Sequence, residues 1–326
     1  MSVKQLPSSP LKGLLSRKAI ESSSSAGRLL ARLGLRAVAP FGADSIVFDA
    51  GGYSMLLPVS HPLPRYWRGF PNYDRALPRL VRSLSALTQS KEFVIVDIGA
   101  NVGDTAVALL QHPATFVVAI EGNDAFLPHL RQNLSAFTNR SAIIERFIGP
   151  KTAESFVVET CNGTAKLIHA DDGVESSVDM IGLDEALALS NKDDIDLIKI
   201  DTDGFDIQII MNSLAMLNSS NIPIFFEFDP NLAKPVTGDA WIIFDTLLDI
   251  GYSYGIAYVN TGEILRCFRV NDQAAIDEMR AFLSSATPSA YLDLIMFKDV
   301  TRFDHARASE LAHFTGIDTQ FLIIPQ

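Results

Sequence analysis

Residues 94–105 read Val-Ile-Val-Asp-Ile-Gly-Ala-Asn-Val-Gly-Asp-Thr, and this stretch decides the fold of the 326-residue chain. The apolar run 93–96 at its start is short and rich in β-branched residues, as is typical of a parallel strand buried on both faces. Gly99 and Gly103 tolerate the backbone angles of a tight turn and leave room for a ligand to approach the backbone. The stretch therefore predicts a buried strand, a glycine turn and the start of a helix.

The expected helix starts at Asp104 and Thr105, which are common capping residues, and its apolar periodicity continues to Leu110. Free backbone N–H groups and the dipole at a helix start favour an anionic ligand group. A phosphate and the carboxylate of a methionine moiety both meet this condition, so charge alone does not choose between nucleotide cofactors.

The glycine pattern distinguishes these cofactors. A dinucleotide loop has the pattern G-x-G-x-x-G, whose second glycine lets the pyrophosphate approach. Here Asn101 occupies that position and the glycines are spaced as G-x-x-x-G. Glu121 ends the next apolar run, 116–120, where a carboxylate can accept hydrogen bonds from both ribose hydroxyls of either cofactor class. The pattern favours S-adenosylmethionine over a dinucleotide.

Strand patterns and helix patterns alternate along most of the chain. Strands are expected at 93–97, 116–121, 142–148, 195–201, 222–228 and 291–298. Helices are expected at 76–88, 104–111, 124–137, 183–189, 205–217 and 239–249. This alternation predicts a mostly parallel sheet covered by helices on both faces. A strand or hairpin is expected at 45–58, and extra antiparallel strands at 156–169 and 252–268.

Acidic residues follow two of the expected parallel strands. Asp201, Asp203 and Asp206 come after one strand, and Glu227 and Asp229 come after the next. Because ligands of such sheets bind beyond the carboxyl ends of the strands, we expect these ends to face the cofactor loop. Asp206 is the exception, since it is expected to be a solvated residue in the first turn of a helix.

Some roles stay open at these strand ends. Lys199 lies within an apolar strand and needs a buried carboxylate partner, in a structural pair or in the site. Glu227 and Asp229 either bind substrate hydroxyls or close a loop before Pro230. The acidic strand ends offer oxygen ligands for Mg²⁺, but no spacing among them is diagnostic of a metal site, and none is expected.

The chain resembles the FkbM family of S-adenosylmethionine-dependent methyltransferases over about residues 90–230. The motifs that carry the resemblance are Val-Asp-Ile-Gly-Ala-Asn-Val-Gly at 96–103, Ala-Ile-Glu-Gly-Asn at 119–123 with Leu-Arg-Gln-Asn-Leu at 130–134, and Asp-Leu-Ile-Lys-Ile-Asp-Thr-Asp-Gly at 196–204. The family commonly has proline in place of Gly122 and glutamate in place of Asp203. The second departure shortens a candidate carboxylate by one methylene.

The resemblance implies an α/β fold of the class I methyltransferase kind, Rossmann-like and doubly wound, with a mostly parallel seven-stranded sheet and an N-terminal extension. It implies methyl transfer from the sulfonium to a hydroxyl of a small molecule, which we expect to be a sugar of a surface glycan or of a secondary metabolite. Candidate cofactor-binding residues are Asp97, Gly99, Ala100, Asn101, Gly103, Asp104, Thr105, Glu121, Gly122, Asn123 and Asp201. Candidate catalytic residues are Asp201, Asp203 and Glu227.

The segment 65–74, which precedes the first strand of the predicted domain, combines aromatic and cationic residues. Aromatic faces stack on sugar rings, and arginine binds anionic groups. We expect Trp67 and Tyr73 of this segment, together with Asp229, to bind the acceptor. The alternative is a loop packed against the edge of the sheet.

Composition restricts the class of protein. A net charge of −11 argues against a nucleic-acid binder, because such proteins cluster positive charge over their footprint. Two distant cysteines without metal-ligand spacing, and no run long enough to span a membrane, predict a soluble protein of the reducing cytoplasm. The functional alternatives are a nicotinamide-dependent oxidoreductase and a catalytically silent binding subunit with the same fold.

The expected organisation has four parts. A basic, serine-rich leader covers 1–44, and a hairpin and helix at 45–90 form a substrate-binding or lid segment. The catalytic domain covers 91–300, and 301–326 form a C-terminal tail. The leader is expected to be partly disordered and to pack on the domain or on a second subunit of a homodimer, the alternative being a helix at a membrane surface.

Overall fold

The computed structural model describes residues 45–50, 53–88, 92–149, 156–161, 164–169, 180–192, 194–286 and 290–316. The leader predicted at 1–44 lies outside these described residues. The chain divides into two compact units, one comprising Met1–Phe70 with Cys161–Gly163 and the other Pro71–Thr160 with Thr164–Gln326. No helix in the described part of the chain has both the length and the apolar character needed to span a membrane.

The first unit contains the hairpin expected at 45–58. Strand β1 (Ser45–Asp49) pairs antiparallel with β2 (Ser54–Pro58), and helix α3 (Leu63–Gly69) follows. Pro64 stands in the first turn of α3, where its missing N–H costs no helical hydrogen bond. The aromatic segment predicted as a binding or packing loop is therefore partly helical, and Trp67 packs against Phe48 with ring centroids 5.6 Å apart.

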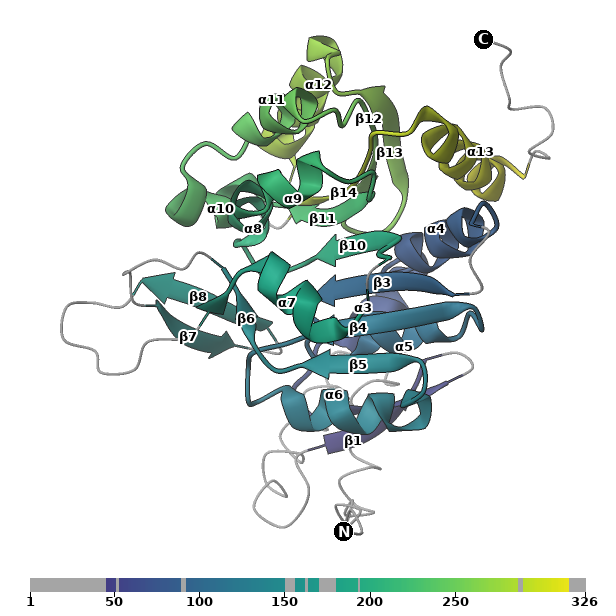
Figure 1. The fold of residues 1–326 in the computed structure, drawn as a ribbon, viewed down its shortest axis with the longest axis vertical. Coiled ribbons are helices and arrows are strands. Elements are labelled where there is room, and N and C mark those ends of the chain that lie inside the picture. Colours follow the sequence, from purple (N-terminus) through teal and green to yellow (C-terminus); the bar gives the residue numbers. More distant parts are fainter. Residues whose placement is uncertain are drawn as a thin grey trace, which may run out of the picture. The chain divides into compact units, whose positions relative to one another are not determined.

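The second unit is built on an eight-stranded sheet (Figure 1). Its strands are, in spatial order, β13 (Ile264–Arg269), β12 (Tyr254–Val259), β14 (Leu292–Phe297), β11 (Ile224–Phe228), β10 (Leu197–Ile200), β3 (Phe93–Ile98), β4 (Thr115–Ile120) and β5 (Ser141–Ile144). The five strands from β11 to β5 are parallel, and β14, β12 and β13 join antiparallel. The predicted α/β, Rossmann-like, mostly parallel sheet is confirmed.

The predicted number of seven strands is wrong by one. The segment 252–268 forms β12 and β13, and this hairpin continues the main sheet because β12 pairs with β14, with Ile256 opposite Ile295. The four middle residues of β12 are all buried, as is required of a strand with neighbours on both sides. The outer strand β13 is the eighth.

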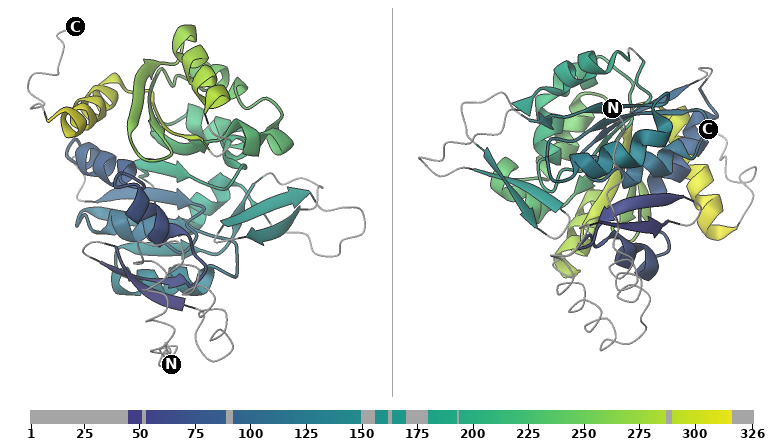
Figure 2. Two further views of the ribbon diagram at one scale, coloured as in Figure 1. Left: turned by 180° about the vertical axis from the view of Figure 1, so that it is seen from behind. Right: turned by 90° about the horizontal axis from the view of Figure 1, so that it is seen from below.

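Helices cover both faces of this sheet, as a doubly wound fold requires (Figures 1 and 2). Helices α4 (Ala76–Ser85) and α5 (Asp104–Leu110) lie on one face, and α7 (Leu183–Ser190) and α8 (Asp206–Asn212) lie on the other. In α4 the buried residues Leu77, Leu80, Val81 and Leu84 follow helical spacing, so a single apolar stripe faces the sheet.

The remaining elements complete the second unit. They are α6 (Leu127–Leu134), the 3₁₀ turn η2 (Ser135–Phe137), α9 (Leu214–Asn218), α10 (Pro230–Thr237), α11 (Ile242–Asp249), α12 (Gln273–Ser285) and α13 (Val300–Thr315). Two small sheets pair β6 (Phe147–Ile148) with β9 (Met180–Ile181) and β7 (Phe156–Cys161) with β8 (Thr164–His169). The strand expected at 142–148 is thus divided between two sheets, and the described part of the predicted tail is α13, which packs on α4.

Candidate functional site

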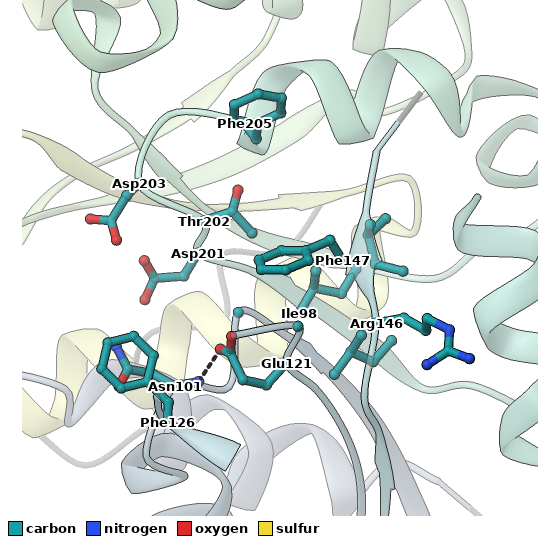
Figure 3. Close-up of a pocket in the computed structure, with 14 residues that line it drawn as sticks. Ile98, Asn101, Glu121, Phe126, Arg146, Phe147, Asp201, Thr202, Asp203 and Phe205 are labelled. Atoms are coloured by element: carbon teal, nitrogen blue, oxygen red, sulfur yellow. Dashed lines mark hydrogen bonds between the residues drawn. The ribbon is translucent and has the colours of Figure 1, made fainter. Parts of the chain in front are cut away.

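A pocket of about 530 Å³, its open mouth included, lies beyond the carboxyl ends of β3, β4 and β10 (Figure 3). This is the place where open parallel sheets bind ligands. Its lining residues are Ile98, Gly99, Asn101, Ile120, Glu121, Gly122, Phe126, Arg146, Phe147, Ile148, Asp201, Thr202, Asp203 and Phe205. Six of the predicted site residues are among them.

The glycine turn after β3 contacts the loop after β10 without an intervening side chain. Gly99 has φ +76°, and a Cβ added there would lie 1.8 Å from the backbone oxygen of Asp201. Gly103 also has a positive φ, and a Cβ there would lie 2.8 Å from a methyl carbon of Leu130. Gly99 is therefore required by close packing against backbone as well as by its backbone angle, and it lines the pocket; at Gly103 the backbone angle is the main requirement.

Glu121 closes the next wall and is only 7% exposed. Its Oε2 accepts a hydrogen bond from the backbone N–H of Asn101 (2.8 Å; Figure 3), and its Oε1 accepts one from that of Asn123 (2.7 Å). Burial raises the pKa of this carboxyl group, and the two N–H donors oppose the rise. Each carboxylate oxygen keeps further acceptor capacity, so Glu121 can still accept bonds from ligand hydroxyls.

Residues around Glu121 shape the turn rather than line the pocket with polar atoms. Asn123 is 7% exposed, and its Oδ1 accepts a hydrogen bond from the N–H of Ala125 (3.0 Å), which starts the turn into α6. Gly122 lies under Phe147, because a Cβ there would be 2.3 Å from the ring. The absence of a side chain at 122 thus lets an aromatic ring form the pocket's upper wall.

The start of α5 holds the remaining candidates of the first motif. Ala100 is buried, and Asp104 and Thr105 are half-buried as the first two residues of the helix. Burial raises the pKa of Asp104 to about 6, although Lys199 opposes the rise. Asp97 is fully buried on β3 and does not line the pocket; burial raises its pKa and the Lys199 ammonium lowers it.

The loop after β10 presents Asp201, Thr202 and Asp203 to the pocket. Asp203 has φ +52°, a left-handed conformation that aspartate adopts more readily than most residues. Asp206 holds this loop from below. Its Oδ1 accepts from the N–H of Thr202 (3.2 Å), and its Oδ2 accepts from Thr202 Oγ1 (3.2 Å) and from the N–H of Gly204 (3.2 Å).

The expectation that Asp206 is solvated is wrong, because the side chain is buried and only 2% of the residue is exposed. Burial raises its pKa to about 7, and the charge of Asp201 adds to the rise. A sequence reading overlooks such a residue because the first turn of a helix is normally at the surface. Here the loop 201–204 folds back over it.

Glu227 is the last residue but one of β11, is 9% exposed, and is not among the residues that line the pocket. Its partner across the sheet is Asp293 of β14. Burial raises the pKa of Glu227 well above its usual range, and the charges of Asp201 and Asp206 add to the rise. Asp293 was not among the predicted residues, although a single carboxylate inside the apolar strand 291–298 is the same kind of signal that marks Lys199.

Tyr73 reaches the same group of residues. Its side chain forms a hydrogen bond with that of Tyr291, and burial together with Asp74 and Asp201 raises its pKa. The pKa of Tyr291 is raised by burial and by Tyr73, Glu227 and Asp293. The predicted residue Tyr73 therefore interacts with Asp201, while Tyr291 was missed because it is the first residue of the strand expected at 291–298.

Two predicted substrate-binding residues have other surroundings. Asp229 caps α10, since its Oδ1 accepts from the N–H groups of Asn231 (2.8 Å) and Leu232 (3.1 Å). Trp67 belongs to the first unit and packs there on Phe48. Substrate binding by these two residues stays a prediction.

Eight lining residues were not among the predicted site residues: Ile98, Ile120, Phe126, Arg146, Phe147, Ile148, Thr202 and Phe205. Phe126 and Phe205 each directly precede a helix that follows a site motif, so an aromatic residue at that place was the available signal. In the described residues, no three His, Cys, Asp or Glu side chains are arranged to hold a metal ion.

The raised pKa of Asp293 predicts a pH dependence of stability. Burial raises it from the ordinary 3.8 to about 8, so the folded state holds the proton more tightly than the unfolded state. The stabilisation is complete below pH 4 and is lost as the pH rises toward 8, by at most about 1.4 kcal/mol per pH unit for one group. In Asp293→Asn, the free energy of unfolding measured with urea is expected to depend less on pH between pH 5 and 8. The exposed Asp277→Asn is the control, and an unchanged slope in Asp293→Asn contradicts the prediction.

A protein-family profile described as the methyltransferase FkbM domain matches residues 97–286, more than half of the chain. None of the curated proteins compared with the chain matches it. Among solved structures, the chain is similar to the methyltransferase FkbM from Methylobacillus flagellatus, with 14% identity and a TM-score of 0.39, over 88% of this chain and 58% of that one.

Two other solved structures are similar at a comparable level. Precorrin-6y C5,15-methyltransferase from Geobacter metallireducens has 15% identity and a TM-score of 0.35, over 68% of this chain and 87% of that one. An rRNA methylase from Streptococcus thermophilus has 10% identity and a TM-score of 0.37, over 69% of this chain and 97% of that one.

Proposed function

The chain belongs to the FkbM family of methyltransferases, and we propose that it transfers a methyl group from S-adenosylmethionine to a hydroxyl of a small molecule, a sugar of a surface glycan or of a secondary metabolite. The observation that carries the proposal is Glu121, a buried carboxylate at the end of β4 that lines the pocket and has acceptor capacity left. Two ribose hydroxyls are the ligand groups that match it.

The rest of the pocket fits the adenosine and methionine parts of this cofactor. Phe126, Phe147 and Phe205 supply apolar ring surface for a purine. The half-exposed carboxylate of Asp201 stands beyond the glycine turn, where it attracts the cationic amino and sulfonium groups. When bound, the cofactor would supply the electrophilic methyl carbon, and the described residues would hold it in line with the acceptor oxygen.

The same geometry disfavours the oxidoreductase alternative. Close approach of a pyrophosphate requires glycine at the second position of the turn. That position is Asn101, whose N–H is already bound to Glu121. The pyrophosphate of a dinucleotide would therefore meet the Asn101 side chain and an N–H group that already donates to Glu121, at a position where it requires glycine backbone.

Methyl transfer needs alignment of the acceptor hydroxyl and removal of its proton. Asp201, Asp203 and Glu227 are the carboxylates that we assign to these tasks. Because its pKa is raised, Glu227 is a stronger base, once deprotonated, than an ordinary carboxylate. Turnover should therefore rise with pH as the Glu227 carboxyl loses its proton. Alignment contributes up to about 7–11 kcal/mol to such reactions, against about 10²–10⁴ in rate for a base.

Titration calorimetry with S-adenosylhomocysteine and with NAD⁺ tests the proposal. We expect a saturable heat with the first ligand and none with the second, followed by transfer of a labelled methyl group to a member of a sugar panel. Heat from NAD⁺ alone would reverse the assignment. Binding of S-adenosylhomocysteine without methylation of any hydroxyl compound in a broad panel would favour the silent binding subunit.

The compartment and the assembly are part of the proposal. Cys267 is a free thiol, in keeping with a reducing cytoplasm. A small hydroxylated acceptor, and no nucleic acid, suits a site rich in carboxylates. The homodimer expected from the leader stays a prediction.

A further inference from the structure

The ammonium of Lys199 meets three oxygen atoms inside the second unit. Its Nζ lies 2.9 Å from Asp97 Oδ1, 3.3 Å from Asp201 Oδ2 and 3.3 Å from the backbone oxygen of Gly99. The ammonium donates a hydrogen bond to the Gly99 carbonyl and forms ion pairs with the carboxylates of Asp97 and Asp201. Lys199 is 4% exposed, in the middle of β10.

The three acceptors differ in their need for this cation. Asp97 is fully buried, and an unpaired carboxylate there would carry a large desolvation cost. The Asp201 side chain is 49% exposed, so water could solvate it without Lys199. The ion pair with Asp201 therefore restrains a side chain that burial alone does not restrain.

Two pocket walls are joined through this one group. Gly99 and Asp201 both line the pocket and belong to loops after neighbouring strands, β3 and β10. Their backbones touch directly, since a Cβ on Gly99 would lie 1.8 Å from the oxygen of Asp201. Lys199 adds a second connection from below, and this one also fixes the carboxylate.

We propose that Lys199 is a positioning residue, which uses Asp97 as a buried counter-charge to hold the Gly99 carbonyl and the Asp201 carboxylate at one spacing for the cofactor. This inference rests on the proposed function, because the cofactor is the ligand whose binding requires that spacing. The competing view is that Lys199 only neutralises Asp97.

A variant without either buried charge separates the two views. Lys199→Met alone leaves Asp97 unpaired and is expected to lower the Tm strongly or prevent folding. Asp97→Val combined with Lys199→Met replaces the ion pair by apolar side chains, which is often neutral for stability. We expect this double variant to regain the wild-type Tm within a few degrees but to bind S-adenosylhomocysteine roughly tenfold more weakly in calorimetry.

The control is Lys298→Met. This lysine also donates to backbone oxygens, those of Leu217 (2.6 Å) and Asn218 (3.2 Å), but it follows the carboxyl end of the antiparallel strand β14, at the opposite end of the strands from the pocket. Its affinity for S-adenosylhomocysteine should equal that of the wild type. Wild-type affinity in the charge-free double variant would overturn the positioning role. If the double variant does not fold, Lys199→Arg decides, since retained folding with weakened binding supports positioning and unchanged binding contradicts it.

A double-mutant cycle shows whether Lys199 acts through Asp201. The charge-free double substitution is made in the wild type and in an Asp201→Ala background, and the two losses of affinity are compared. We expect the loss to be roughly threefold smaller without Asp201, and equal losses contradict the inference. Absence of heat from the wild type would instead refute the proposed function, so the two failures are distinguishable.

Discussion

Glu121→Ala is expected to weaken the binding of S-adenosylhomocysteine by about 10²-fold or more. A hydrogen bond to a charged group contributes about 1.5–3 kcal/mol, and two ribose hydroxyls would lose their acceptor together. The substitution also leaves the N–H groups of Asn101 and Asn123 without the carboxylate that orders the turn. Both effects act on binding, and calorimetric titration measures their sum.

Asp124→Ala is the matched control for this prediction. It removes an exposed carboxylate from the same loop, three positions along the chain and outside the pocket lining. Its affinity for S-adenosylhomocysteine should equal that of the wild type. Equal affinities in the wild type and Glu121→Ala would show that Glu121 orders the loop without touching the cofactor, and would remove the main support for the proposed function.

Gly99→Ala is expected to destabilise the fold by about 3 kcal/mol or more. The new Cβ would lie 1.8 Å from the backbone oxygen of Asp201, so two strand ends must separate. Overpacking of this kind costs about 1–3 kcal/mol, and a left-handed φ costs alanine about 1–2 kcal/mol more. Urea unfolding measures the difference in free energy of unfolding.

Gly316→Ala separates the two contributions. Gly316 has φ +68°, close to the +76° of Gly99, but a Cβ there meets nothing within 4 Å. This control should therefore lose only about 1–2 kcal/mol. If both variants lose the same amount, the contact between the two loops is loose and the close approach described above is incorrect.

The parts of the fold that could be predicted are those whose burial is complete. Strand β3 was expected at 93–97 and is found at Phe93–Ile98, because every residue in it is buried and the pattern has no competing explanation. The edge of the sheet could not be predicted as well. Strand β13 is mostly half-buried, with only Phe268 fully buried, and nothing local tells whether its hairpin joins the main sheet or stands apart.

The break between α8 and α9 was not predicted. The helix expected at 205–217 ends at Asn212, and α9 begins at Leu214. The Ser213 hydroxyl donates to the carbonyl of Ile209, a local bond that competes with helix continuation. Periodicity of apolar residues does not reveal such a break.

Prediction of the site succeeded at the ends of parallel strands and failed elsewhere. Glu121 and Asp201 follow β4 and β10 directly, so their position along the sequence places them at the pocket. Asp293 and Tyr291 reach the same end of the sheet from the start of β14, which runs antiparallel. If β14 were assumed to be parallel like its neighbours, these two residues would be placed at the opposite end of the strands from the pocket.

The contact between Lys199 and Gly99 joins residues 100 positions apart. The pairing of β3 with β10 therefore closes a long loop, and non-local parallel pairing of this kind is slow during folding. The pocket walls should be completed late, after β3 and β4 have already paired. When refolding is monitored by S-adenosylhomocysteine binding, it should therefore be slower than when it is monitored by circular dichroism. The protein thus gains its ligand affinity as one of its last folding events.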